Sequence, residues 1–214
     1  MPLSRAAVPY VVCPQCQSLL LRSTDDLGDD LKTVGKSAVL PFDVSPIMIG
    51  TRGIADGQAF EVVGRVRWGW VDGAWNEWLL SLDDGSTRWL GEAMGTFMLL
   101  AEAPHACDLD AIRRFANGGR MAPGTAVTVE GQDFIVADVK AATCLGAEGQ
   151  LPFAAPAHWT VTSVDFRNPD GASLSVQRDS EGTSAYLGRY IDLDALKPRG
   201  LRRFDDWAMP AGLQ

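Results

Sequence analysis

The residues GQAFEVVGRVRWGW, from Gly57 to Trp70, decide how this chain folds. Apolar side chains recur at a spacing of two along this run, which is typical of a strand with one buried face. These positions are Phe60, Val62, Val66, Trp68 and Trp70. Arg65 and Arg67 are expected on the opposite face. Turn sequences at residues 72–73 and 84–85 join further apolar runs, so the sequence predicts an antiparallel meander over residues 57–100.

Two pieces of this meander recur later in the chain. GQAFEV at 57–62 is echoed by GQDFIV at 131–136, and GSTRWLG at 85–91 is echoed by GTSAYLG at 182–188. Because the two echoes keep their order, we expect two related β-modules, at 51–103 and 124–197. The predicted fold class is mostly β, with two related antiparallel meander or barrel-like modules and one short linking helix.

The remaining segments are assigned by shorter patterns. Residues 104–123 are predicted to hold the linking helix, with Asp108 as its cap, Ile112 and Phe115 on one face and Gly118-Gly119 at its end. Residues 1–50 are expected to form a degenerate zinc knuckle and an edge segment. Residues 198–214 are read as a solvated, partly docked tail rather than a phosphate or lipid-headgroup site.

Composition places the chain among ordinary globular proteins. It has 214 residues, of which 46% are hydrophobic and 21% charged, and a formal net charge of −8. An acidic chain repels phosphate backbones, so nucleic-acid binding is not expected. No apolar run is long enough to span a bilayer, and no secretion signal is recognisable at the start. We therefore expect a cytoplasmic protein that is not transmembrane, with peripheral membrane association only through a partner.

Cys13 and Cys16 have the spacing of one knuckle of a zinc ribbon. A complete ribbon needs a second pair about fifteen to twenty residues further on, and that region contains neither cysteine nor histidine. Three interpretations stay open. The knuckle is metal-free, or zinc is completed by His105 and Cys107, or the pair shares zinc across a dimer or acts as a redox pair. The cofactor is accordingly none or zinc.

Several short motifs occur in an order that is similar to one bacterial family. They are the Cys13–Cys16 knuckle, Gly64-Arg65, the residues 73–78, Trp89-Leu90-Gly91, the residues 148–152 and Tyr186-Leu187-Gly188. Together they resemble the domain-of-unknown-function 4178 family over Cys13 to about Leu196. The resemblance implies a two-knuckle zinc ribbon at the start, of which this chain keeps only the first knuckle. It also implies an accessory role, because the family has no established activity.

Glu77 is the candidate catalytic residue. It shares a strand face with Trp75, and a carboxylate held against an indole can have a raised pKa suited to acid–base chemistry. The competing interpretation is a cross-strand ion pair with Arg65 or Arg67. The sequence contains neither a Gly-rich phosphate loop nor a Gly-x-Ser-x-Gly nucleophile elbow.

Four of the seven tryptophans lie in a single predicted hairpin. If Trp68 and Trp70 face the core, Trp75 and Trp78 must lie on opposite faces of their strand, which leaves one of them exposed or covered by the other module. An exposed indole rimmed by polar groups suits a protein interface.

These patterns lead to one functional hypothesis and one alternative. The hypothesis is a non-catalytic adaptor in a bacterial cytoplasmic complex, with membrane stress as its expected setting and a protein as its partner. Its binding residues are Trp75, Trp78, Trp68, Trp70 and Arg65. The alternative is an enzyme with a Glu77-centred acid/base site in a Trp-lined pocket, acting on a small cationic substrate.

Overall fold

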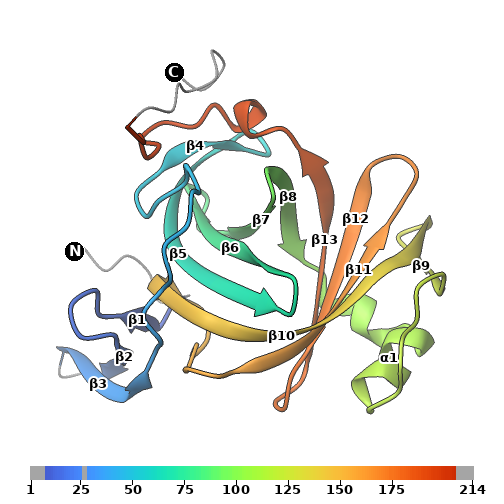
Figure 1. The fold of residues 1–214 in the computed structure, drawn as a ribbon, viewed down its shortest axis with the longest axis horizontal. Helices are drawn as coiled ribbons and strands as arrows, with labels where there is room; N and C mark the ends of the chain where they lie inside the picture. Colours follow the sequence, from blue (N-terminus) through green and yellow to red (C-terminus); the bar gives the residue numbers. More distant parts are fainter. Residues whose placement is uncertain (1–7, 26–27, 206–214) are drawn as a thin grey trace.

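The protein is mostly β, as the sequence predicts. The computed structural model describes residues 8–25 and 28–205, except the side chains of residues 23–30 (Figure 1). Its strands are β1 (Tyr10–Val12), β2 (Ser18–Asp25), β3 (Gly28–Lys36), β4 (Arg52–Ala55), β5 (Gln58–Trp70), β6 (Gly73–Leu82), β7 (Thr87–Ala93), β8 (Thr96–Glu102), β9 (Ala126–Val129), β10 (Gln132–Leu151), β11 (Thr160–Arg167), β12 (Ala172–Arg178) and β13 (Thr183–Ile191). Its helical segments are η1 (Pro104–Asp108), α1 (Asp110–Ala116) and η2 (Leu193–Leu196).

Eight antiparallel strands close into one barrel. Their order is β5-β6-β7-β8-β13-β12-β11-β10, and β10 returns to β5 through pairs from Cys144 with Trp68 to Gly149 with Gly64. The ring of strands is visible in Figure 1, where β11, β12 and β9 lie on the side nearer α1. Strands from both predicted modules therefore contribute to the same sheet. That the two modules are an internal repeat stays a prediction.

The long strand β10 makes the closure possible. Its first half pairs with β9 and β11, and its second half pairs with β5 and β1. At the seam the backbones approach so closely that a Cβ on Gly149 would lie 2.2 Å from the Val63 carbonyl oxygen. Closure of the barrel at this seam therefore requires glycine at position 149. The small β1–β2–β3 sheet continues from the end of β10.

Three apolar clusters hold the barrel together. The first fills one end of the interior and contains Trp68, Leu79 and Trp89. The second lies outside β10–β13 and is covered by α1, whose Ile112 and Phe115 are buried as predicted. Asp108 does not cap this helix, because residues 104–108 form a separate 3₁₀ turn and Leu109 occupies the cap position without a side-chain hydrogen bond.

The third cluster covers the outer face of β5–β8, and it changes the expected environment of Arg65. Ile47 and η2 pack on this face, and Arg65 is only 3% exposed. Its guanidinium pairs with Asp43 and donates to Asn76 Oδ1 at 2.8 Å. The middle of β5 is thus buried on both faces, so the half-buried strand predicted from alternation is wrong.

The C-terminal tail is docked in its described part. Arg202 pairs with Asp43 at 3.5 Å, its backbone N–H donates to the Pro46 carbonyl, and Leu201 packs on the third cluster. Residues 206–214 of the predicted tail, like residues 1–7 and 26–27, lie outside the described residues. Over the described chain, no helix has the length and apolar character needed to cross a membrane.

Candidate functional site

The strand register of β5 and β6 directs Glu77 into the barrel. Trp68 pairs with Trp75 and Val66 pairs with Glu77, so these four side chains share one face of the sheet. Arg67 pairs with Asn76 and belongs to the other face. The alternation that is visible in the sequence therefore sets the inward position of Glu77 once the sheet has closed.

Glu77 is held by three hydrogen-bond donors. Its Oε2 accepts from Trp68 Nε1 at 2.9 Å, and its Oε1 accepts from Trp75 Nε1 at 3.0 Å and from Gln177 Nε2 at 2.5 Å. Gln177 belongs to β12, which lies across the barrel from β6 in the strand order. The expected ion pair with Arg65 or Arg67 is wrong, because both arginines pair with Asp43 on the outer face.

The electrostatic environment of Glu77 is unusual. Enclosure in the barrel raises its pKa, hydrogen bonds from Trp75, Trp68 and Gln177 lower it in part, and the charge of Asp165 raises it further. All three partners donate, so they suit the ionised carboxylate. Within the described chain, no lysine or arginine forms an ion pair with Glu77. An ionised Glu77 therefore has no counter-ion within hydrogen-bonding distance in the described chain.

Asp165 on β11 is the second interior carboxyl. Burial raises its pKa, whereas the hydrogen bond from Ser175 Oγ at 3.0 Å and the charges of Lys140 and Arg167 lower it. Burial is the largest of these effects. Two carboxyls with raised pKa values therefore face one interior space, a combination that often marks a functional site.

That space is a cavity of about 240 Å³ that is lined by all eight barrel strands. Its aromatic walls are Trp70, Trp75 and Tyr190, its acids are Glu77, Glu92, Asp138 and Asp165, and its bases are Lys140 and Arg167. Lys140 pairs with Asp138, and its Nζ lies 5.1 Å from the centre of the Trp70 ring. The Arg167 guanidinium lies 5.9 Å from the Tyr190 ring. The two bases are thus engaged with other groups of the cavity wall.

The tryptophans do not form the predicted exposed surface. Trp78 is completely buried on the outer face of β6, where its Nε1 donates to Glu92 at 2.9 Å. Trp75 points into the barrel and packs against Trp68 and Trp70, with ring centres 6.3 and 5.5 Å away. Trp68 is also fully buried. Of the predicted binding residues, Trp75 and Trp70 line the cavity together with Glu77, whereas Trp78 and Arg65 lie outside it.

Sequence reasoning missed the residues that come from distant strands. Asp165, Gln177, Lys140 and Tyr190 lie at least 63 positions from Glu77, and only barrel closure brings them near it. A signal was present in β11, where Ser163 and Asp165 alternate with apolar residues and so indicate a polar inward face.

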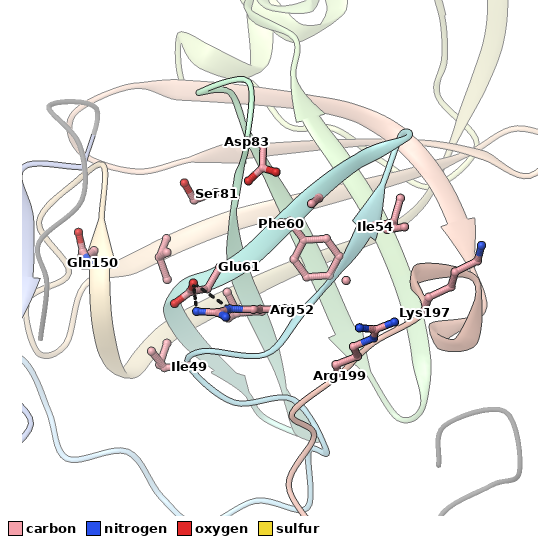
Figure 2. A pocket seen from close by; sticks show the side chains of 14 residues that line it. Ile49, Arg52, Ile54, Phe60, Glu61, Ser81, Asp83, Gln150, Lys197 and Arg199 are labelled. Carbon is pink, nitrogen blue, oxygen red and sulfur yellow. Dashed lines mark hydrogen bonds and ion pairs between the residues drawn. The ribbon is translucent and has the colours of Figure 1, made fainter.

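A second hollow of about 720 Å³ lies on the outer surface beside β4 (Figure 2). Its rim carries Arg52, paired with Glu61 at 2.9 Å, and the exposed cations Lys197 and Arg199. Arg52 and Arg199 exchange backbone hydrogen bonds, which fixes the tail against β4. Its charges are exposed to water and therefore interact weakly, so this groove is a poorer candidate than the interior cavity.

The cysteines do not assemble a zinc site. Cys13 and Cys16 lie in the β1–β2 turn, and hydrogen bonds with Ser18 lower the pKa of the exposed Cys16 thiol to about 7. His105 pairs instead with Glu130 at 3.1 Å. No group of three or more potential metal ligands occurs among the described residues, so the structure does not bring Cys13 and Cys16 together with His105 and Cys107. Two thiolates supply half of a tetrahedral structural site, and the knuckle does not fit zinc by itself.

Asp165→Asn is expected to stabilise the protein at pH 8 by about 1 kcal/mol, the size typical of substitutions that relieve a functional site. A carboxyl whose folded-state pKa is raised contributes stability below its ordinary range, and that stability is lost as the pH rises through the folded-state pKa. Asparagine keeps an oxygen for Ser175 without the charge. The advantage should therefore shrink as the pH falls from 8 toward 4.

Urea denaturation across this pH range measures the effect, with Asp83→Asn, an exposed turn residue, as the control that should change stability by less than about 0.5 kcal/mol. A less stable Asp165→Asn protein at pH 8 would show that the charge of Asp165 is itself stabilising.

The fold and its interior define a class of protein: a closed antiparallel barrel with an acidic, tryptophan-lined cavity. A family profile described as Domain of unknown function (DUF4178) matches residues 48–193, and the chain belongs to this family. The match includes all eight barrel strands and excludes Cys13 and Cys16, so it is shorter than the resemblance expected from sequence motifs. No curated protein and no solved structure matches the chain.

Proposed function

We propose that this protein binds a small organic cation inside the barrel, at the cavity formed around Glu77. The observation that carries the proposal is the Glu77 carboxylate, which accepts three hydrogen bonds inside the barrel and has no cationic partner in the described chain. An ionised carboxylate removed from water is costly unless a positive charge compensates it. A bound ammonium group would supply that charge.

The cavity walls suit the same ligand. Trp70, Trp75 and Tyr190 offer aromatic faces, which attract cations most strongly where water is excluded. The contact between Lys140, Asp138 and Trp70 illustrates this mode of binding, since it holds an ammonium group between a carboxylate and an indole. The mouths of barrels are also common positions for ligand sites.

A binding role accounts for Glu77 better than proton transfer does. The three donors suit an ionised carboxylate and occupy most of its acceptor positions. A general acid or base must instead exchange a proton with its substrate through a free oxygen. We therefore assign Glu77 to ligand binding, within the same Trp-lined pocket that the enzyme alternative invoked.

The adaptor role predicted from the sequence depended on an exposed tryptophan. Trp78 is buried and Trp75 faces the cavity, so neither presents an exposed indole. A protein partner, a cytoplasmic location and a link to membrane stress stay predictions without an assigned surface.

Isothermal titration with three ligands of equal chain length tests the proposal. We expect butylammonium to bind at pH 8 at least about tenfold more tightly than 1-butanol, because only the cation compensates Glu77. Butyrate should not bind, since its charge is repelled by Glu77 and Asp165. Equal binding of the three ligands, or a preference for butyrate, would contradict a cation site.

A further inference from the structure

Two exposed apolar residues stand at the open end of the cavity. The β5–β6 and β7–β8 turns lie at the same barrel end, because β6 starts where β7 finishes in the antiparallel register. Val71 in the first turn is 93% exposed, and Met94 in the second is 94% exposed and lines the cavity. Both side chains are presented to water beside the entrance.

Met94 occupies a position that favours other residues. Met94 and Gly95 form a two-residue hairpin connection with φ of 48° and 78°, the geometry that prefers Asn-Gly or Asp-Gly. A left-handed conformation is unfavourable for a residue with a Cβ, such as methionine. Two other connections with this geometry carry polar first residues, in Asp56-Gly57 and Glu130-Gly131. Met94 is the apolar member of this set, and it is the one at the cavity entrance.

We propose that the ligand is an amphiphilic cation, whose ammonium group binds near Glu77 and Asp165 and whose apolar chain leaves the barrel along Met94 and Val71. This inference rests on the proposed function and adds the chemical class of the ligand. It assigns Met94 as a specificity-determining residue.

The size of the cavity supports this arrangement. A volume of about 240 Å³ holds about eight waters at roughly 30 Å³ each, so it accepts a head group and a short chain. A longer chain must continue through the opening. Ala93, Thr96 and Met98 also line the cavity from β7 and β8, and they connect its interior with the turn that carries Met94. The flexible side chain of Met94 can adapt to chains of different shape.

A series of primary alkylammonium ions from butyl to octyl, titrated below their micellar concentrations, tests the inference. In the native protein each added methylene should tighten binding about two- to fourfold, as expected for its removal from water. In Met94→Asn, the gain per methylene should fall to less than half of the native gain. Val71→Ser should act in the same direction.

The Met94→Asn variant separates binding from folding. Asn-Gly is favoured in this turn, so its melting temperature should equal or exceed that of the native protein. Butylammonium binding without any dependence on chain length, or an unchanged dependence in Met94→Asn, would overturn this inference alone. Failure of every alkylammonium to bind would overturn the proposed cation site together with it. Native affinity for octylammonium in Glu77→Gln would place the binding outside the cavity and overturn the inference.

Discussion

Glu77→Gln is expected to weaken butylammonium binding by about 30-fold or more, because removing one partner of a desolvated charge pair costs about 2–5 kcal/mol. Glutamine has nearly the shape of glutamate, but it carries no charge, and its amide nitrogen is a donor, so the hydrogen bond from either Trp68 or Trp75 loses its acceptor. Isothermal titration at pH 8 measures the loss directly.

The matched control is Glu61→Gln on the outer surface. Glu61 is also a strand carboxylate, but it pairs with the exposed Arg52 and does not line the cavity. Its replacement should leave butylammonium affinity within about twofold, since exposed ion pairs contribute little. Asp165→Asn gives a second interior variant that is expected to fold well and still bind weakly. Native affinity in both Glu77→Gln and Asp165→Asn would place the cation elsewhere.

Gly149→Ala is expected to reduce the free energy of unfolding by about 3–5 kcal/mol, the range reached by strained or overpacked sites. Gly149 has a φ of 75°, and an added Cβ would lie 2.2 Å from the Val63 carbonyl oxygen, which belongs to the backbone and cannot move aside alone. The substitution acts on the seam between β10 and β5, so closure itself is weakened. Urea denaturation followed by tryptophan fluorescence measures the change.

Gly131→Ala isolates the conformational part of this effect. Gly131 has a φ of 77°, and nothing lies within 4 Å of an added Cβ. The Gly131→Ala variant should therefore lose only about 1–2 kcal/mol of the free energy of unfolding, which is the cost of the left-handed conformation. If both variants lose the same free energy, the close approach at the seam does not contribute to stability.

Local patterns predicted much of the fold. The Gly-containing turns are short-range signals, and the strands β5 to β8 are joined at them. The alternation from Phe60 to Trp70 holds only in part, because a bulge between Val62 and Gly64 puts Phe60 and Val62 on the outer face and Val66 and Trp68 on the inner face. The helix α1 was predicted from the spacing of Ile112 and Phe115. These predictions succeed because strand alternation and helix periodicity depend on neighbours in the sequence.

The candidate site could be predicted only in part. Glu77 and Trp75 were placed correctly on one strand face, since that relation is local. Arg65 was placed correctly on the opposite face, but its burial was not predicted, because alternation separates two faces of a strand without indicating whether a distant segment covers the second. Asp43 and η2 supply that cover here. The hydrogen bond that Gln177 donates to Glu77 joins residues that are 100 positions apart in the sequence.

The sequence by itself determined that this protein is an antiparallel β structure with Glu77 and Trp75 on one strand face, because periodicity and turn chemistry act over a few residues. Only the tertiary structure decided that Glu77 faces Asp165 and Gln177 across a cavity, and that its expected arginine partners pair outside the barrel. The physical reason is the pairing of β10 with β5. This pairing closes the sheet into a barrel, so that one face of every barrel strand points into the same interior.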